Sequence, residues 1–278
     1  MQYFVSIENT SYFYWQTELL LESFLMQNMQ DDLIIGIAEN DIPKLSKFSH
    51  NLVNHPNIFF HSNEGEKNEY KSLNRFYGLL AALTDGRLKC PFTLVHSDMI
   101  LVKPVEEKEE NLVFHPLYDD TVDSMTKPYI KEMAEIGGVT VEDLPSHIPF
   151  NGPIVFQDVP IELIWRAKNR TEVLLKENGP TFPCEKVGWS LAFYEMLSSV
   201  AYGGEYMECS LIDPMSELNV NFVHYKHGIP PVFHKRHFTW DKPNLSGINP
   251  YEVLLEHNPT PATNFVQKVI RSYNKRAY

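Results

Sequence analysis

The sequence has few cysteines, a deficit of basic residues and no long apolar runs. Its three cysteines, Cys90, Cys184 and Cys209, are far apart and form no Cys-x-x-Cys pair, so neither a disulfide framework nor a zinc knuckle is predicted. Acidic residues outnumber basic ones by 36 to 24, and the net charge of −12 argues against binding to nucleic acid or to anionic membrane surfaces. No stretch approaches the roughly 18 consecutive apolar residues of a membrane helix, so no membrane span is predicted.

The start of the chain and its size favour one soluble α/β protein. The first nine residues lack the basic segment and long apolar run of a signal peptide, and with so few cysteines this predicts a cytoplasmic location. At 278 residues and 43% hydrophobic content, the chain is long enough for one large domain. We therefore predict one domain over residues 1–240 and a C-terminal extension over residues 241–278 that packs on it.

Apolar runs of strand length alternate with segments of helical periodicity. Strands are predicted at residues 2–7, 33–38, 57–61, 92–95, 99–102, 151–156 and 219–225. Helices are predicted from residue 11 onward and over residues 42–53, 68–83, 161–177, 185–200 and 265–273, with a weak helix at 125–135 inside an irregular insertion at 118–147. Strands that alternate with helices predict an α/β fold with a mostly parallel sheet.

The most informative segment is residues 92–104, FTLVHSDMILVKP, in which His96, Ser97 and Asp98 interrupt two apolar runs. A carboxylate buried there is costly unless it has a partner. We therefore expect Asp98 at the carboxyl end of a strand, where open α/β sheets bind ligands. Two interpretations are open at this point: Asp98 is a ligand of a divalent cation that holds a diphosphate, or it caps backbone amides in a turn.

Histidines and basic residues gather late in an otherwise acidic chain. Residues 223–238 hold four histidines together with Lys235 and Arg236, which favours contact with phosphate. His224 ends a predicted strand, and a neutral imidazole beside a carboxylate is an acceptable set of ligands for Mn²⁺ or Mg²⁺. The alternatives are a hydrogen-bonded core histidine and an ordinary basic surface turn. No individual role is assigned to His227, His234 or His237.

Two further segments are candidates for contact with a nucleotide. Ser6, Ile7, Glu8 and Asn9 leave the first predicted strand at the same sheet edge as Asp98. The segment Asn74-Arg75 lies in the helix before the Asp98 strand, where a guanidinium reaches a phosphate with two hydrogen bonds. A solvated helix face is the alternative for this pair.

Six short segments occur in the same order as motifs of a known group of enzymes. They are YFYWQTELLLESF at 12–24, LNR at 73–75, HSD at 96–98, NGPIV at 151–155, GWSL at 188–191 and HYKHG at 224–228. In this the chain resembles the plant hydroxyproline O-arabinosyltransferases and the related peptidyl serine galactosyltransferases, over residues 3–240. The resemblance implies a GT-A glycosyltransferase fold with a mixed, mostly parallel central sheet, a UDP-sugar donor and transfer with retention of configuration.

The resemblance also implies roles for single residues. Asp98 corresponds to the acid of the DXD element that binds the metal, His224 is the late ligand, and His96 stands where the group has an acid. An acid expected a few residues after Trp189 aligns with Ala192, although Glu185 lies nearby.

We therefore place Asn151, Glu185 and Trp189 around the sugar, with structural roles for all three as the alternative. We expect the acceptor to be a hydroxyl of a glycan, a peptide or a small molecule. The particular peptide that the membrane-anchored plant enzymes modify is not assumed to be the acceptor of this chain.

Three other functions compete with a glycosyltransferase. A nucleotidyltransferase would have a similar sheet, but no glycine-rich phosphate loop follows the first strand. A metal-dependent hydrolase would use the same histidines, but no HExxH pair is present. A catalytically inactive module that binds a nucleotide sugar or a glycan is consistent with the reduced acidic triplet.

Overall fold

The structure is a computed structural model that describes residues 1–40, 52, 54–106, 112–114, 131, 135, 140, 153–158, 161–180, 184–196, 201–202, 208–210, 217–225 and 260–277. A central sheet has the strand order β3-β2-β1-β4-β7-β6-β8. Its strands are β1 (Gln2–Glu8), β2 (Leu33–Ala38), β3 (Ile58–His61), β4 (Phe92–Leu94), β6 (Leu112–Phe114), β7 (Ile154–Phe156) and β8 (Ala201–Tyr202).

The central sheet is mixed but mostly parallel. β1 lies parallel to both β2 and β4, so that Tyr3 is opposite Leu33 on one side and Thr93 on the other. β3 is parallel to β2 and β8 is parallel to β6, whereas β7 runs antiparallel to β4 and β6. The predicted α/β fold class is therefore confirmed, and the carboxyl ends of β1 to β4 share one edge.

A second sheet of three strands carries the late part of the chain. It has the order β5-β10-β9, formed by β5 (Met99–Leu101), β10 (Phe222–His224) and β9 (Glu208–Ser210). β10 is antiparallel to β5 and parallel to β9, and its register sets His224 opposite Met99. Because β5 follows β4 after only four residues, this sheet begins where the central sheet ends.

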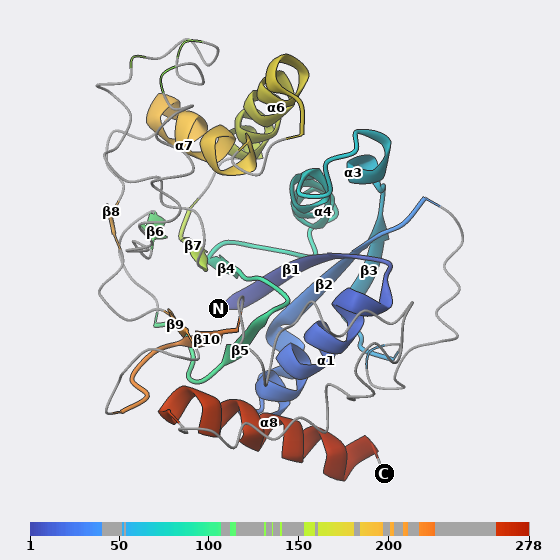
Figure 1. Ribbon diagram of the computed structural model, residues 1–278, viewed down its shortest axis with the longest axis vertical. Coiled ribbons are helices and arrows are strands. Elements are labelled where there is room, and N and C mark those ends of the chain that lie inside the picture. Colours follow the sequence, from blue (N-terminus) through green and yellow to red (C-terminus); the bar gives the residue numbers. More distant parts are fainter. Residues whose placement is uncertain are drawn as a thin grey trace.

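Helices cover both faces of the central sheet (Figure 1). The helices are α1 (Ser11–Met26), the 3₁₀ turn η1 (Gln30–Asp32), α3 (Glu64–Lys67), α4 (Leu73–Thr84), α6 (Ile161–Asn178), α7 (Cys184–Met196) and α8 (Pro261–Ala277). α3 and α4 lie on one face, and α1 and α8 on the other (Figure 1). Among the described residues, no helix combines the length and the apolar character that crossing a bilayer requires.

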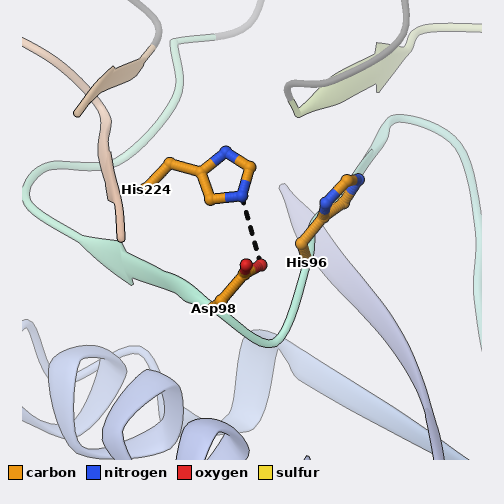
Figure 2. Close-up of side chains that lie close together, drawn as sticks. All are labelled: His96, Asp98 and His224. Atoms are coloured by element: carbon orange, nitrogen blue, oxygen red, sulfur yellow. Dashed lines mark ion pairs between the residues drawn. The ribbon is translucent and has the colours of Figure 1, made fainter. Parts of the chain in front are cut away.

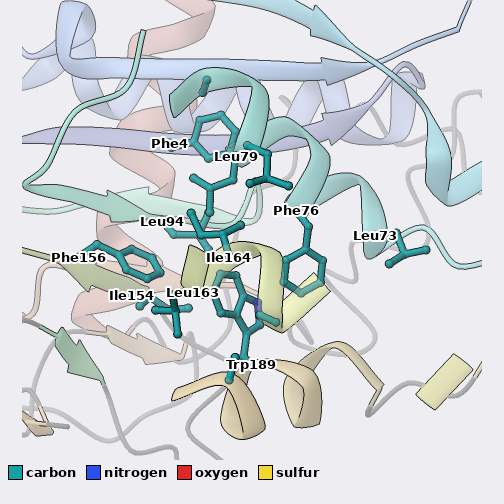
Figure 3. Close-up of a cluster of buried hydrophobic side chains, with 14 of the residues drawn as sticks. Phe4, Leu73, Phe76, Leu79, Leu94, Ile154, Phe156, Leu163, Ile164 and Trp189 are labelled. Atoms are coloured by element: carbon teal, nitrogen blue, oxygen red, sulfur yellow. The ribbon is translucent and has the colours of Figure 1, made fainter. Parts of the chain in front are cut away.

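The alternation of side chains along β1 explains the two layers. Phe4 points into a core under α4, α6 and α7, which Figure 3 shows with Phe76, Phe156 and Trp189. Its neighbours Tyr3 and Val5 point into a second core under α1. Successive residues of a strand face opposite sides, so a central strand buried on both sides is apolar throughout.

Two helix starts differ from the sequence prediction. The helix predicted over 68–83 begins at Leu73, because Glu69 has a φ of 55° that separates α3 from α4. The last helix begins at Pro261 rather than near residue 265, since Thr260 caps it by accepting a hydrogen bond from the Thr263 N–H at 3.1 Å.

Three predicted features fall largely outside the described residues. They are the helix over 42–53, the insertion at 118–147 and the domain boundary at residue 240. Of the predicted C-terminal extension, α8 is described, and it packs on α1 and the second sheet in a third core with Trp15, Val223 and Tyr225.

Candidate metal centre

Asp98 lies in the short link between β4 and β5. The ladder between β4 and β1 continues to Val95, whose N–H donates to the Phe4 carbonyl at 2.9 Å. The chain then turns tightly, with the Met99 N–H donating to the His96 carbonyl at 3.2 Å. The Asp98 residue is only 5% exposed, so its carboxylate is held in the protein interior at the carboxyl end of a central strand.

His224 faces Asp98 from the last position of β10. Its Nε2 lies 3.2 Å from Oδ1 of Asp98, and the two side chains are 4% and 7% exposed (Figure 2). The two residues are far apart in the chain, and the antiparallel register of β10 with β5 brings them together. A buried carboxylate that faces a buried imidazole satisfies the requirement that a buried charge has a partner.

His96 completes a cluster of three potential ligands. Its ring lies edge-on to the His224 ring, with centroids 5.4 Å apart and an angle of 81° between the planes. One ligand atom from each of His96, Asp98 and His224 lies within 4.8 Å of the others. Figure 2 shows the three side chains converging from the turn after β4 and from β10.

The donor set fits a divalent cation. Carboxylate oxygen with imidazole nitrogen suits Mn²⁺, and Mg²⁺ takes such ligands when phosphate oxygens and water complete the shell. Adjacent ligands of an octahedral ion, each about 2.1 Å from it, lie about 3 Å apart. The separation of 3.2 Å between Asp98 and His224 is close to this value.

The predicted nucleotide residues at the end of β1 have different environments. Ile7 is a core residue at 2% exposure, whereas Ser6 donates to the Asn74 carbonyl at 3.1 Å. Glu8 is paired with Lys71, Oε2 to Nζ, at 2.9 Å. Asn9 donates to a Glu39 oxygen and accepts from the hydroxyl of Tyr14.

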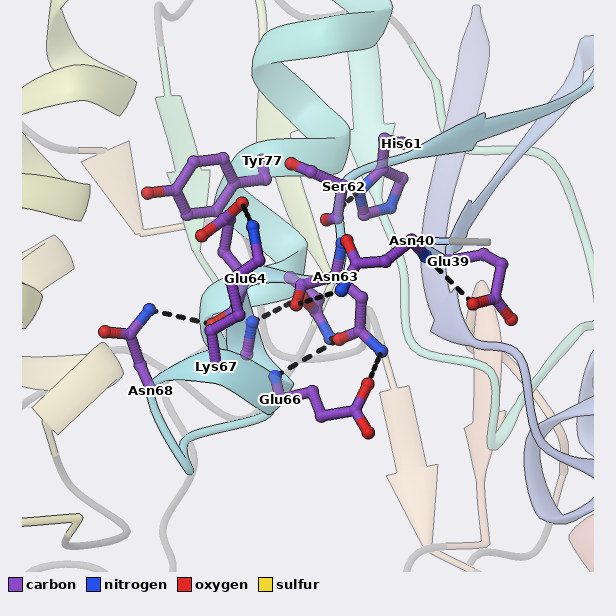
Figure 4. A network of polar contacts seen from close by, with 12 residues as sticks. Glu39, Asn40, His61, Ser62, Asn63, Glu64, Glu66, Lys67, Asn68 and Tyr77 are labelled. Carbon is purple, nitrogen blue, oxygen red and sulfur yellow. Dashed lines mark hydrogen bonds and ion pairs between the residues drawn. The ribbon is translucent and has the colours of Figure 1, made fainter. Parts of the chain in front are cut away.

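The end of β2 repeats the end of β1. Glu39 and Asn40 directly follow β2, just as Glu8 and Asn9 end and follow β1, and these two pairs lie on neighbouring parallel strands. Asn40 exchanges hydrogen bonds with the backbone of Asn63, at 2.8 and 3.2 Å (Figure 4). Glu39 was not predicted as a site residue, although a Glu-Asn pair follows each of the two predicted strands, at Glu8-Asn9 and at Glu39-Asn40.

His61 lies beside this edge at the end of β3. Burial lowers the pKa of His61 to about 4, although the neighbouring Ser62 carbonyl opposes the shift. Its Nε2 lies 3.2 Å from the Ser6 hydroxyl. The ring is therefore neutral at physiological pH and fills the space between β1 and α4.

Asn74 and Arg75 separate into two roles. Asn74 is 3% exposed, and its amide accepts from the Gly65 N–H and donates to the Asn63 side chain, which ties α3 to α4. Arg75 instead reaches across to α7, where its Nη1 lies 2.5 Å from Oε1 of Glu185. The Glu185 N–H donates to the Tyr70 hydroxyl at 3.0 Å, and burial beside this carboxylate raises the pKa of Tyr70.

The other predicted site residues are either in the core or outside the described residues. Trp189 is 1% exposed, and its ring lies 4.9 Å from Phe76 and 5.9 Å from Phe156, centroid to centroid. Its environment is that of a packing residue. Asn151, Lys235 and Arg236 lie outside the described residues.

Comparison with known proteins identifies the fold alone. No protein-family model and no curated protein matches the sequence. Among solved structures, the chain is similar to the galactosyltransferase LgtC in complex with donor and acceptor sugar analogs, at 10% identity, with 98% of this chain and 96% of that chain covered and a TM-score of 0.52. An active-site mutant of LgtC matches at 10% identity, 81% and 87% coverage and a TM-score of 0.51. The chain therefore has the α/β fold of the GT-A glycosyltransferases.

Proposed function

We propose that this protein is a metal-dependent glycosyltransferase that moves a sugar from a UDP-sugar to a hydroxyl acceptor, with retention of configuration. The observation that carries the proposal is the cluster of the buried Asp98 and His224 with the half-buried His96 at the carboxyl end of β4, in a chain with a GT-A fold. In open α/β sheets ligands bind at this edge.

The cluster would hold Mn²⁺ or Mg²⁺ through the Asp98 carboxylate and the His224 imidazole, with His96 as a third ligand. Such a cation neutralises negative charge that develops on a leaving diphosphate. The chain contributes a fixed, buried set of ligands that needs no rearrangement when the charge appears. Lys235 or Arg236 would assist departure as a second positive charge.

The donor would lie along the edge formed by β1, β2 and β4. We place its base and ribose near Ser6, Ile7, Glu8 and Asn9, since β1 adjoins the strand that leads to Asp98. Among these residues, Glu8 and Asn9 are polar and lie at the carboxyl end of β1. The carboxylate Glu39, which accepts a hydrogen bond from Asn9, extends the same polar edge.

The sugar would lie near the Arg75–Glu185 pair. This pair joins α4 to α7, and the Glu185 side chain is 8% exposed. A carboxylate fixed by a guanidinium is a suitable acceptor for sugar hydroxyls and opposes positive charge on the ring. Asn151, which precedes β7 in the sequence by three residues, would also contribute, and Trp189 would support this wall from the core.

In the transfer step, the acceptor oxygen forms a bond to the anomeric carbon while the bond from that carbon to the diphosphate oxygen breaks. UDP leaves with the electron pair, and the proton of the acceptor hydroxyl passes to the departing diphosphate. Attack on the face that the leaving group vacates gives retention. The acceptor would be a hydroxyl of a glycan, a peptide or a small molecule.

Finer parts of the proposal rest on the sequence motifs. Kinship with the plant hydroxyproline O-arabinosyltransferases and peptidyl serine galactosyltransferases depends on six short segments. We also propose that residues 1–240 form the catalytic domain, that residues 241–278 pack on it as an extension, and that the protein acts in the cytoplasm. Packing of α8 on α1 and the second sheet supports the proposed extension.

A donor-hydrolysis assay tests the function. The protein is incubated with a panel of UDP-sugars and Mn²⁺, and released UDP is measured with and without EDTA. Asp98→Asn should reduce the rate by roughly 100-fold or more, because the cation supplies several kcal/mol of charge stabilisation. Asp85→Asn is the matched control, since Asp85 is an exposed carboxylate at the end of α4. Equal rates for wild type and Asp98→Asn would contradict the proposed site.

The released nucleotide product and a titration with UDP separate the rival functions. A nucleotidyltransferase would release pyrophosphate from a nucleoside triphosphate and no UDP from any UDP-sugar. An inactive binding module would bind UDP equally well with and without Mn²⁺ and would turn over no donor.

A further inference from the structure

Three motif residues without a role in the proposed site are linked to the turn between β4 and β5, two by hydrogen bonds to Ser97 and one by packing on Tyr225. Trp15 and Gln16 belong to the segment on α1, and Tyr225 directly follows His224. All three are almost fully buried, with exposed fractions of 0%, 1% and 1%. Gln16 and Tyr225 both form hydrogen bonds with Ser97, the residue between His96 and Asp98, and Trp15 packs against Tyr225. Two segments that are distant in the chain therefore converge on the turn that carries two of the proposed ligands.

Gln16 holds the side chain of Ser97. The Ser97 hydroxyl donates to Oε1 of Gln16 at 3.1 Å. The other end of the same amide is also fixed, because Nε2 of Gln16 donates to the Tyr12 carbonyl at 2.9 Å. The amide is therefore oriented by its own helix, so that its oxygen faces the turn between β4 and β5.

Tyr225 holds the backbone of the same turn. Its N–H donates to the Asp98 carbonyl at 3.0 Å, and its hydroxyl donates to the Ser97 carbonyl at 3.4 Å. Its ring lies 5.9 Å from the Trp15 ring, centroid to centroid. Tyr225 thereby links the strand end that carries His224 to the turn that carries Asp98.

We propose that Gln16 and Tyr225 are positioning residues that fix Asp98 and His224 in a geometry ready for a divalent cation. This inference rests on the proposed function. Neither residue is a ligand; both act through the Ser97 turn. The energetic reason is that ligands held in place before binding lose little conformational freedom when the cation arrives. Outer residues of this kind typically change metal affinity by about 10- to 100-fold.

The test measures the affinity of the purified, metal-free protein for Mn²⁺ alone, by the electron paramagnetic resonance signal of free Mn²⁺. The variants are Gln16→Leu, Ser97→Ala, the double variant and Tyr225→Phe. Thr17→Val is the matched control, because Thr17 is equally buried on α1 but donates to the Phe13 carbonyl rather than to the turn. Thermal unfolding of each metal-free variant is measured alongside.

We expect Gln16→Leu and Ser97→Ala each to weaken Mn²⁺ binding by roughly tenfold. The double variant should be no weaker than either single variant, because both remove the same hydrogen bond. Tyr225→Phe keeps the ring against Trp15 and loses only the hydroxyl, so a smaller loss of roughly threefold is expected. Tyr225→Phe still tests the proposal if Gln16→Leu does not fold.

The possible failures are distinguishable. If wild type binds Mn²⁺ and Asp98→Asn does not, but Gln16→Leu, Ser97→Ala and Tyr225→Phe bind like wild type, the positioning role is overturned and the metal centre stands. The positioning role is also overturned if Thr17→Val weakens binding as much as Gln16→Leu does. If wild type binds no Mn²⁺, or Asp98→Asn binds it equally well, the metal centre is overturned and the positioning role with it.

Discussion

At Gly188, α7 lies very close to α6, and a single methyl group there tests the packing of the proposed sugar site. A Cβ atom at this position would lie 2.8 Å from the Ala167 carbonyl oxygen and 2.9 Å from the Thr171 nitrogen, and closer still to the Thr171 hydroxyl. Thr171 is fully buried, and its hydroxyl donates a hydrogen bond to the Ala167 carbonyl at 2.8 Å. Two of the three contacts are backbone atoms, so the helices themselves must move apart to admit Gly188→Ala.

The expected cost combines two opposing effects. Alanine is favoured over glycine in a helix interior by about 1 kcal/mol. Overpacking a well-packed core typically costs about 1–3 kcal/mol and sometimes more. Because backbone atoms cannot relax by changing a rotamer, we expect a cost at or above the upper end, and a net destabilisation of about 2 kcal/mol.

Urea unfolding of Gly188→Ala measures this loss as a lower midpoint at an unchanged slope. A double variant with Thr171→Ala should recover part of the loss, because the hydroxyl contact disappears while the backbone contacts remain. Glu185 lies one turn earlier on α7, so separation of the helices should also weaken its pairing with Arg75. A Gly188→Ala protein as stable as wild type would refute the close approach.

Three further changes test charged or titratable groups in the interior. Arg75→Met removes the guanidinium that pairs with the Glu185 carboxylate, whose side chain is only 8% exposed. Urea unfolding should show a loss of about 2–3 kcal/mol in the free energy of unfolding. This is below the full cost of breaking a buried pair, because Arg75 is itself 25% exposed. Arg276→Gln should cost about 1–2 kcal/mol in the same assay, because Glu22 is 1% exposed and its carboxylate lies 3.3 Å from this half-exposed arginine. Burial lowers the pKa of His61 to about 4, so below about pH 6.5 the unfolded chain binds a proton that the native state does not. As the pH falls from 7 to 5, the free energy of unfolding of the wild type should therefore decrease by about 2 kcal/mol more than that of His61→Gln.

Each of these three has a result that would count against it. A double variant Arg75→Met/Glu185→Gln should be more stable than Arg75→Met alone, and equal stability would mean that the pair is not desolvated. Lys275→Gln on the exposed face of α8 should leave stability within about 0.5 kcal/mol, and a loss equal to that of Arg276→Gln would remove the special role of Glu22. Parallel stability curves for wild type and His61→Gln between pH 7 and pH 5 would contradict the buried, neutral histidine.

Five strands of the central sheet, β1 to β4 and β7, could be predicted because their sequences are apolar over strand length, whereas β6 and β8, with three and two residues, were not predicted. The run at residues 33–38 became β2 with the same bounds, and residues 92–95 became β4 with one residue fewer. That Asp98 would have a partner such as His224 was also predictable, because a buried carboxylate at a strand end needs a partner and His224 ends a predicted strand. The identity of the partner strand was not, because pairing of β10 with β5 depends on tertiary structure.

Contacts between polar side chains on different helices could not be predicted. Helical periodicity indicates the apolar face of α4 but not that Arg75 reaches Glu185, which is 110 residues away in the chain. The same limit applies to Trp189: an aromatic residue after a glycine is compatible with a sugar platform and with a core position, and packing against Phe76 decides for the core. The contact between Gln16 and Ser97 likewise required the placement of α1 over the turn.

The position of His224 is determined by its apolar neighbours rather than by the site itself. Along β10, Val223 and Tyr225 face the core shared with α1 and α8, while Phe222 and His224 face the other side. A slip of one residue would move both core residues to the wrong face and remove the imidazole from Asp98. Burial of Val223 and Tyr225 therefore selects the register that pairs His224 with Asp98. Helix α8 completes that core and so helps to position His224 in the proposed metal centre without supplying a ligand to it.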